Sequence, residues 1–259
     1  MWRPFHQICD TRTMKLEEVV TYQNDLLRVA EFRDYPNALN GLQLENSGTV
    51  ARVAAAVDAC EPVLKMAVET GADLLIVHHG LFWGGLQSVT GPQYRKLKLA
   101  IDNNLAVYSA HLPLDAHPQC GNNALLCNAL GFPEPRRPFL EIGFQIEAEV
   151  QREILKERIE RAVGDRVHLA PGGPTVARRI GIVTGGAGGE VFKAAAEGID
   201  TFITGEGPHW SFTAAEELGI NLFYAGHYAT EVFGVRQLAT LLQEKFGLPW
   251  EFLHHPTRL

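Results

Sequence analysis

Six side chains in this sequence could bind metal ions together, because each offers an imidazole nitrogen or a carboxylate oxygen. Two of the histidines are adjacent, and each of the other two precedes a carboxylate by four positions. The six residues are His78, His79, His111, Asp115, His227 and Glu231. Mixed nitrogen and oxygen ligands suit Zn, Fe, Mn or Co, and no thiolate accompanies them to select a softer metal. Even three of these histidines with the two carboxylates exceed what one closed tetrahedral site takes. The set therefore favours two ions bridged by a carboxylate, with open positions for water.

Each candidate also has a structural alternative. Successive side chains of a strand point to opposite faces, so the adjacent histidines share a site only if the chain bends at Gly80; otherwise one caps a helix and the other is solvated. His111 could orient a metal ligand, which we favour, or be a core histidine satisfied by hydrogen bonds. Asp115 could cap a helix, and Glu231 could complement the dipole of a helix start. If both adjacent histidines bind metal, their diverging rings suit one ion each better than one ion together.

A second group of candidates lies in the segment Thr204–Trp210. Glu206 and His209 could line the same cleft and, with His111, transfer protons or contact the substrate; a place at the start of a helix explains His209 equally well. The glycine-rich run Gly185–Gly189 follows a predicted strand, but it lacks the further residues of phosphate-binding loops. A tight turn that brings helix and sheet close together is the better interpretation of this run.

The elements that must position these residues are predicted strands alternating with helices of about ten residues. This alternation indicates an α/β fold with mostly parallel sheets, in which ligands bind at the carboxyl ends of the strands. Residues 53–80 match residues 180–207 in the order of strand, helix, Gly-x-Asp and strand, with five identities. The weak repeat predicts two pseudo-duplicated α/β lobes that face each other across a metal-binding cleft.

The domain organisation follows from these elements and from the proline and glycine clusters between them. We expect residues 1–15 to be a loose N-terminal extension and residues 16–133 to form the first α/β lobe. Residues 134–174 are predicted to connect the lobes as a β-α-β segment, in which residues 139–148 are extended. Residues 175–259 are expected to form the second lobe.

The composition excludes several classes of protein. The chain has 259 residues and a formal net charge of −7, and its lysines and arginines are scattered, so nothing indicates a nucleic-acid-binding face. No apolar run approaches the ~18 residues of a membrane span. The four cysteines have no CxxC spacing. Their irregular placement favours reduced thiols and a cytoplasmic protein over a disulfide framework.

Five short motifs occur in order between Leu16 and Leu253. They are Asn40-Gly41-Leu42-Gln43, Asp73-x4-His78-His79-Gly80, Ala110-His111-x3-Asp115, Thr204-Gly205-Glu206 and Gly226-His227-x-Ala229-Thr230-Glu231. Together they resemble the motifs of the NIF3-like family of dinuclear-metal-centre proteins. Some members of that family are labelled type 2 GTP cyclohydrolase homologues.

The resemblance implies a two-lobed α/β subunit, a toroidal homohexamer, and two divalent metal ions in a cleft that opens inward. Carried over by position, it implies that the metal ligands are His78, His79, Asp115, His227 and Glu231, with Glu231 bridging the ions. The chain resembles the short form of the family, because residues 134–174 leave no room for an inserted domain. Residues 252–257 depart from the Pro-Asn-Pro type of tail that is common in the family.

Two functional hypotheses remain open at this point. The first is a metal-dependent hydrolase, in which two ions activate a shared water and polarise the substrate. The family label adds GTP ring opening as one possible reaction, although the chain has no nucleotide-binding motif. The alternative is a non-catalytic, metal-binding oligomeric scaffold or regulatory protein that recruits partners. A fold does not decide between them, because function depends on the site.

Overall fold

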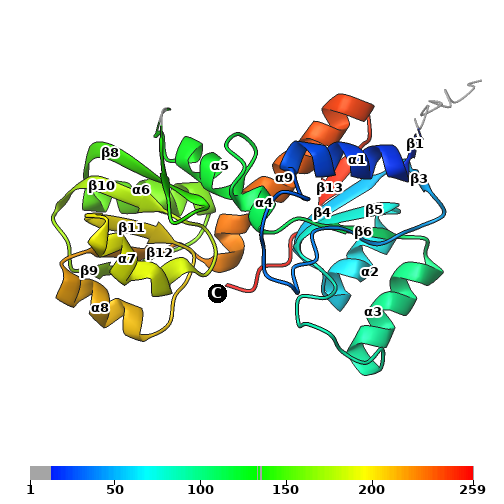
Figure 1. Cartoon of the computed structure of the whole chain (residues 1–259), viewed down its shortest axis with the longest axis horizontal. Helices are drawn as coiled ribbons and strands as arrows, with labels where there is room; N and C mark the ends of the chain where they lie inside the picture. The colour runs from blue at the N-terminus through cyan, green and yellow to red at the C-terminus, as the bar shows by residue number, and fades with distance from the viewer. Residues whose placement is uncertain (1–12, 133, 135, 259) are drawn as a thin grey trace, which may run out of the picture.

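The computed structural model describes residues 13–132, 134 and 136–258. Two lobes, each built on one large β-sheet, lie side by side, and helix α9 (His227–Phe246) lies between them (Figure 1). Residues 1–12 of the expected N-terminal extension lie outside the described residues. The end of that extension is not loose, because Met14–Lys15 forms the short strand β1, which pairs with β3 (Thr49–Val50).

The first sheet has the strand order β13-β4-β5-β6-β2. Its strands are β2 (Gly41–Leu44), β4 (Val53–Asp58), β5 (Leu74–His79), β6 (Ala106–Ser109) and β13 (Trp250–Phe252). β13, β4, β5 and β6 are parallel, and the edge strand β2 is antiparallel. Every residue of β5 and β6 is buried, as expected for central parallel strands that are covered on both faces.

Helices cover both faces of the first sheet. α1 (Leu16–Leu27) and α9 pack on one face, and α2 (Glu61–Glu69) and α3 (Gly91–Asp102) pack on the other (Figure 1). The sequence of β4 explains this arrangement, since its side chains alternate between the faces. Val53 and Ala55 join the core under α1 and α9, whereas Ala54 and Ala56 join the core under α2 and α3.

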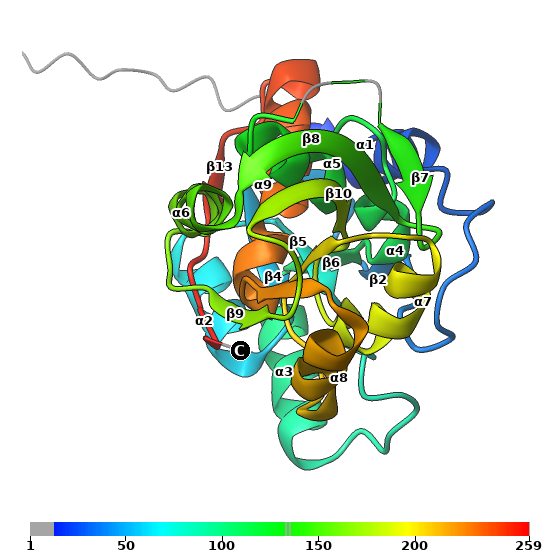
Figure 2. The same cartoon turned by 90° about the vertical axis from the view of Figure 1, so that its left-hand side faces the viewer.

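The second sheet has the strand order β7-β8-β10-β11-β12-β9. Its strands are β7 (Arg137–Phe139), β8 (Gly143–Gln151), β9 (His168–Pro171), β10 (Val176–Ile182), β11 (Thr201–Thr204) and β12 (Asn221–Tyr224). The central β10, β11 and β12 are parallel, and the outer strands are antiparallel. α5 (Asn122–Ala129) and α6 (Arg152–Val163) cover one face, and α7 (Val191–Ala196) and α8 (Trp210–Leu218) cover the other (Figure 2).

The two sheets contain the same parallel unit. In the first sheet Val53 of β4 is paired with Leu74 of β5, and in the second Ile180 of β10 is paired with Thr201 of β11. The second pair is the first shifted by 127 residues, which is the offset of the sequence repeat. The fold is therefore α/β, with parallel central strands in both lobes.

The end of the chain does not stay in the second lobe, as we expected for residues 175–259. β13 pairs in parallel with β4 of the first sheet. The apolar side chains of α9, among them Val235, Leu238 and Leu242, are buried in the core of the first lobe. Burial of this apolar face explains why the chain goes back to the first lobe. Without α9, one face of the first sheet would be only partly covered.

The connecting segment, residues 134–174, contributes strands to the second sheet. The extended piece that we expected at residues 139–148 is instead a hairpin, in which β7 and β8 pair antiparallel. Leu140 and Glu141 form its turn, and both have positive φ. β8 then pairs with β10, and β9 pairs with β12 at the opposite edge of the sheet.

No helix within the described residues is long and apolar enough to cross a membrane. Cys60, Cys120 and Cys127 are free thiols, and Cys9 lies outside the described residues.

Candidate metal centre

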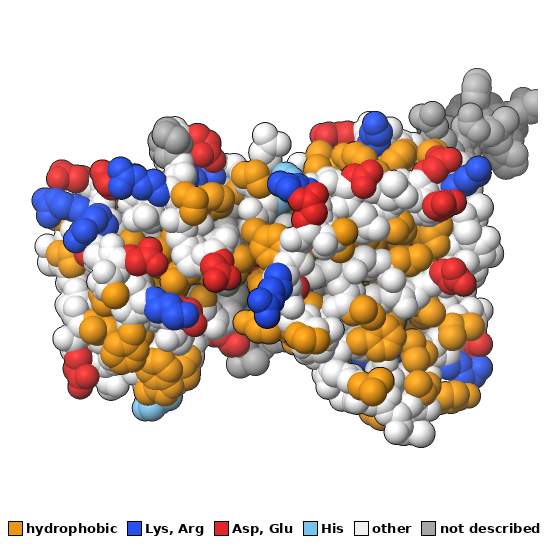
Figure 3. Space-filling model, in the orientation of Figure 1, with side chains coloured by type: hydrophobic (Ala, Val, Ile, Leu, Met, Phe, Trp, Pro, Cys, Tyr) orange, Lys and Arg blue, Asp and Glu red, His pale blue; other side chains and the backbone are white. Residues whose placement is uncertain are grey.

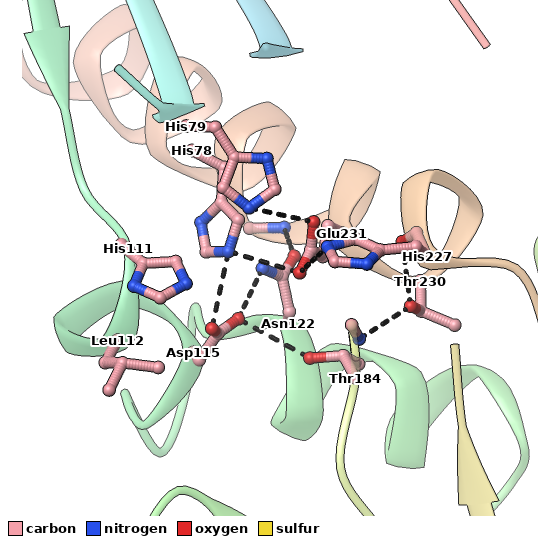
Figure 4. A network of polar contacts seen from close by, with 12 residues as sticks. His78, His79, His111, Leu112, Asp115, Asn122, Thr184, His227, Thr230 and Glu231 are labelled. Carbon is pink, nitrogen blue, oxygen red and sulfur yellow. Dashed lines mark hydrogen bonds and ion pairs between the residues drawn. The ribbon is translucent and has the colours of Figure 1, made fainter. Parts of the chain in front are cut away.

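The six predicted residues meet where the two lobes face each other. His78 and His79 end strand β5, His111 follows β6, and the short helix α4 (Leu112–Asp115) carries Asp115. The first two turns of α9 carry His227 and Glu231 (Figure 4). Strand ends of the first sheet therefore supply three of the residues, α4 supplies the fourth, and α9 brings the other two from the opposite side. The N-cap of α9 is Gly226, whose φ of 90° favours glycine.

Glu231 lies at the middle of the cluster. Its Oε1 lies 3.1 Å from His227 Nε2 and 3.5 Å from His78 Nε2. Its Oε2 lies 3.6 Å from His79 Nε2, and Asp115 Oδ2 lies 3.3 Å from His78 Nε2 (Figure 4). One carboxylate thus faces three imidazoles with both of its oxygens. Three sets of potential ligand atoms lie within 4.8 Å of one another: His78-His79-His111, His79-His227-Glu231 and His78-Asp115-Glu231.

Each of the three imidazoles that face Glu231 through Nε2 is held in place by a hydrogen bond at its other ring nitrogen, Nδ1. His78 Nδ1 donates to the carbonyl oxygen of Ala110, at 2.8 Å. His79 Nδ1 lies 2.8 Å from Asp58 Oδ1, and His227 Nδ1 lies 2.9 Å from Glu206 Oε1. Such partners favour a proton on Nδ1, so that each Nε2 directs a lone pair to the cluster when the ring is neutral.

His111 belongs to the cluster, and its Nδ1 is held by Asp34 at 2.9 Å. The Asp34 carboxylate also accepts from the side chain of Asn40 and from the backbone N–H of Leu112. The His111 ring lies 4.9 Å from that of His78, measured between centroids. His111 is therefore positioned by its own carboxylate, and it is not a core histidine satisfied only by the backbone.

Asp115 does not act as a helix cap, because its side chain is held from the second lobe and from α5. Asn122 Nδ2 donates to Asp115 Oδ1 at 2.7 Å, and the hydroxyl of Thr184 lies 3.4 Å from the same oxygen. Asn122 Oδ1 in turn accepts from the backbone N–H of Gly234 in α9, at 2.7 Å. One buried amide therefore connects Asp115 to the helix that carries Glu231.

Glycines allow the backbone to approach the cluster. Gly185, the first residue of the glycine-rich run, has a φ of +70°, and a Cβ at this position would lie 2.3 Å from Glu231 Oε1. This close approach agrees with our interpretation of the run as a tight turn. Gly80 likewise allows a close approach, since a Cβ there would lie 2.2 Å from the side chain of Gln43. The two adjacent histidines before it, both in β5, reach one site, with ring centroids 4.8 Å apart.

The buried charges hold one another in ionised form. Burial alone lowers the pKa of His78, but the carboxylates of Asp115 and Glu231 outweigh it and raise that pKa well above its usual value. Burial likewise lowers the pKa of His227, and Glu231 and Glu206 raise it to about 9. Burial raises the pKa of Glu231, but the neighbouring imidazoles lower it far below the usual value. The geometry therefore favours positive charge between the imidazoles and the carboxylates.

Metal ions fit this donor set. His78 Nε2, His227 Nε2 and Glu231 Oε2 are buried and form no hydrogen bond, although buried polar atoms are normally satisfied. With its proton on Nδ1, a neutral His78 would direct a lone pair at two carboxylates, which is repulsive. A cation between these atoms removes the repulsion and satisfies all three. Nitrogen and oxygen donors of this kind suit Zn, Fe, Mn or Co.

The remaining predicted residues lie beside the cluster. Glu206 contacts His227, and its side chain is 42% exposed. His209 is exposed at the start of α8, and within the described residues no contact joins it to the six. Sequence reasoning missed Asp34, Asp58 and Asn122, although Asp34 and Asn122 lie a few residues from the Asn40 and Asp115 motifs.

Comparison with known proteins agrees with this structure. The model of the family Duf34/NIF3 (NGG1p interacting factor 3) matches residues 14–257. A relative from Deinococcus radiodurans, named GTP cyclohydrolase 1 type 2 homolog, is 40% identical over 250 residues, which are 94% of each chain. A relative of the same name from Archaeoglobus fulgidus is 39% identical over 95% of this chain and 100% of its own.

A solved structure is similar over nearly the whole length of the chain. The crystal structure of TTHA1606 from Thermus thermophilus has a TM-score of 0.89 and 39% sequence identity, and the match covers 95% of this chain and 100% of that one. Sequence motifs, fold and overall similarity thus agree, and the chain belongs to the Duf34/NIF3 family.

Proposed function

We propose that the chain is a metal-dependent hydrolase that binds two divalent metal ions at the cluster around Glu231. The observation that carries the proposal is the convergence of three buried polar atoms without hydrogen bonds: His78 Nε2, His227 Nε2 and Glu231 Oε2. The ligands would be His78, His79, Asp115, His227 and Glu231. Relatives are named GTP cyclohydrolase 1 type 2 homolog, which supports hydrolysis as the reaction class and leaves the substrate open.

The distances suggest how the ligands would be shared. Glu231 is a potential ligand both with His79 and His227 and with His78 and Asp115, so it would bridge the two ions. Asp115 Oδ2 lies 3.3 Å from His78 Nε2, so Asp115 would belong to the ion beside His78. When bound, two such ions supply Lewis acidity, which polarises an electrophilic atom and lowers the pKa of water towards neutrality.

Two residues beside the ligands could move protons. Burial lowers the pKa of His111 despite its hydrogen bond to Asp34, so its ring is neutral near pH 7 and can accept a proton at Nε2. Glu206 lies between His227 and solvent, where its carboxylate can receive a proton and release it. Exposed His209 is better placed to contact substrate than to take part in the reaction.

The test combines metal analysis with turnover. Protein loaded with Mn, Zn, Fe or Co is assayed against phosphoester, amide and cyclic nucleotide substrates, beside His78→Ala and Glu231→Ala. We expect close to two ions per chain and metal-dependent turnover in the wild type, and neither in the variants. Glu244→Ala removes an exposed carboxylate from the same helix and should change nothing. Less than one ion per chain, unchanged by Glu231→Ala, would contradict the metal centre. Full metal content without turnover across the panel would favour the scaffold.

We also propose the homohexamer that the family resemblance implies. Large apolar side chains are exposed around α3 and around α7 and α8, where Figure 3 shows hydrophobic atoms gathered on the surface. They are Leu86, Val89, Tyr94 and Ile101 in the first lobe and Phe192, Trp210, Phe212 and Leu218 in the second. Such surfaces are typical of contacts between subunits. Light scattering should give six times the chain mass of 28.6 kDa, and a monomer at micromolar concentration would contradict the proposal.

A further inference from the structure

A large cavity adjoins the metal centre on the side of the second lobe. Its volume is about 1310 Å³, and its walls are the end of α6, the start of α8, one face of α9 and the C-terminal tail at His254–Arg258. Figure 1 shows this tail ending between the two lobes. The tail is held on α9, because the backbone N–H of His255 donates to the hydroxyl of Tyr228 at 2.9 Å. The volume exceeds that of a simple anion and suits an organic molecule.

The walls of the cavity carry the opposite charge from the chain as a whole. The chain has a formal net charge of −7. The basic residues that line the cavity are Arg161, Arg166, Arg236, Arg258, His168, His209 and His254. Only Asp165 and Glu206 oppose them among the lining residues. A cavity with such walls concentrates anions from solution.

The arginines are available to a ligand. Within the part of the chain that the structure describes, Arg161, Arg166 and Arg258 form no salt bridge, although exposed lysines and arginines elsewhere in the second lobe do. The guanidinium of Arg236 lies 3.9 Å from the centre of the Phe252 ring, which fixes its position on the wall. Guanidinium groups bind phosphate oxygens in pairs, and several around one space suit an anion with more than one charge.

The cavity shares a wall with the metal centre. Glu206 lines the cavity, and its Oε1 accepts from Nδ1 of His227 at 2.9 Å. Tyr228, the next residue of α9, also lines the cavity, and the side chain of His227 is 27% exposed. A ligand held in the cavity would therefore lie beside Glu206, which contacts His227 of the cluster. Apolar wall residues such as Phe212 and Phe233 would contact its organic part.

We propose that this cavity binds the phosphate group of a phosphorylated organic substrate, with Arg161 and Arg166 as its principal contacts. The inference rests on the proposed function, because it places the reacting end of that substrate at the metal centre. It adds the chemical class of the substrate and the residues that select it. Arg236 and the tail close the cavity around the ligand.

The probe for this inference is phenylphosphonate, which carries a phosphate-like group on a carbon–phosphorus bond that is not hydrolysed. Isothermal titration of the metal-loaded protein should show saturable binding that weakens as salt increases. The double variant Arg161→Gln/Arg166→Gln should bind at least about tenfold more weakly. Arg137→Gln, which removes an exposed arginine of the same lobe outside the cavity, is the matched control and should bind as the wild type does. Benzoate, the carboxylate counterpart of the probe, should bind much more weakly than phenylphosphonate.

Several outcomes would overturn the inference: no saturable binding, equal binding by the double variant, or equal binding of benzoate. Titration of the Glu231→Gln variant with phenylphosphonate distinguishes a failure of this inference from a failure of the proposed function. We expect that variant to lose metal and keep arginine-dependent binding of the probe. Probe binding that disappears with the metal and ignores the arginines would place the anion on the ions, which refutes the cavity site. Absence of metal in the wild type, with arginine-dependent probe binding intact, would refute the proposed function alone.

Discussion

His78 and His79 are adjacent in the chain, yet different kinds of partner hold their imidazoles. The inner half of the centre, His78 with Asp115, is buried and is fixed by a backbone carbonyl and the Asn122 amide. The outer half, His79 with His227, is fixed by the carboxylates of Asp58 and Glu206 and is more exposed. The inner half thus depends on the packing of the interior, and the outer half on charged groups that solvent can reach.

The residue shared by both halves should give the largest effect. Glu231→Gln keeps the shape of the side chain but removes the charge that faces all three imidazoles. We expect metal affinity to fall by at least about a hundredfold at both positions, because a neutral amide is a poor bridging ligand. Metal content after dialysis against a buffered chelator measures the change. Glu244→Gln is the control, and loss of only one ion would show that Glu231 does not bridge.

Asn122→Ala should affect the inner half and the fold together. The substitution removes the donor to Asp115 Oδ1 and leaves the backbone N–H of Gly234 without its partner. Leaving such buried groups unpaired should lower the free energy of unfolding by about 2 to 3 kcal/mol, as measured by urea denaturation of the metal-free protein. The variant should lose the ion beside Asp115 first. Equal loss of both ions would contradict the distinction between the halves.

His227 of the outer half should contribute to how the stability of the metal-free protein depends on pH. The pKa of His227 is raised to about 9 in the folded chain, above the unfolded value near 6.5. Protonated His227 therefore stabilises the fold fully below pH ~6.5, and this contribution disappears as the pH rises through 9.

Thermal unfolding measured between pH 6.5 and 9.5 tests whether stability falls as the pH rises. The metal-free protein should lose on the order of 2 kcal/mol over that range, and metal ions, which replace the proton, should flatten the curve. His227→Gln should make the curve shallower, and the part that remains is expected from His78. A metal-free protein that becomes more stable as the pH rises through 9 would contradict the assignment.

The smallest effects are expected for the carboxylates behind the outer imidazoles. Asp58→Asn and Glu206→Gln keep a hydrogen-bond acceptor for Nδ1 but remove the charge that strengthens each ligand. Each substitution should weaken metal binding by about tenfold, and only for the ion nearest that imidazole. Competition with a metal indicator dye measures the change. If either substitution matched the effect of Asn122→Ala on stability, the outer half would depend on packing as the inner half does.

The sequence predicted the parts of this site that depend on local pattern. Apolar runs that end in histidine mark the carboxyl ends of buried strands, and those ends meet at one edge of a parallel sheet. Partners distant in the chain could not be predicted in this way. Asp58 ends a neighbouring strand, and the amide of Asn122 reaches Gly234 across 112 positions. No periodicity encodes such contacts, because they depend on how α5 and α9 pack.

The sequence did not predict that the last strand, β13, pairs with the first sheet, and the physical reason is similar. Trp250–Phe252 has an apolar pattern that would suit the edge of either sheet. The core under α9 decides the outcome, since Val235 and Leu238 fill the face of the first sheet beside α1. Pairing of the last strand follows from that packing and from the length of the segment after Gly247.

The return of α9 and β13 to the first sheet has a consequence for the order of events during synthesis. The first lobe emerges from the ribosome early, but its sheet has an open edge and an incompletely covered face until α9 and β13 have been made. His78 and Asp115 can lie near each other before then, whereas Glu231 cannot. The proposed site for two ions therefore stays incomplete until α9 has been translated. A metal ion that needs Glu231 as a ligand would therefore bind late, to a chain in which α9 already joins the two lobes.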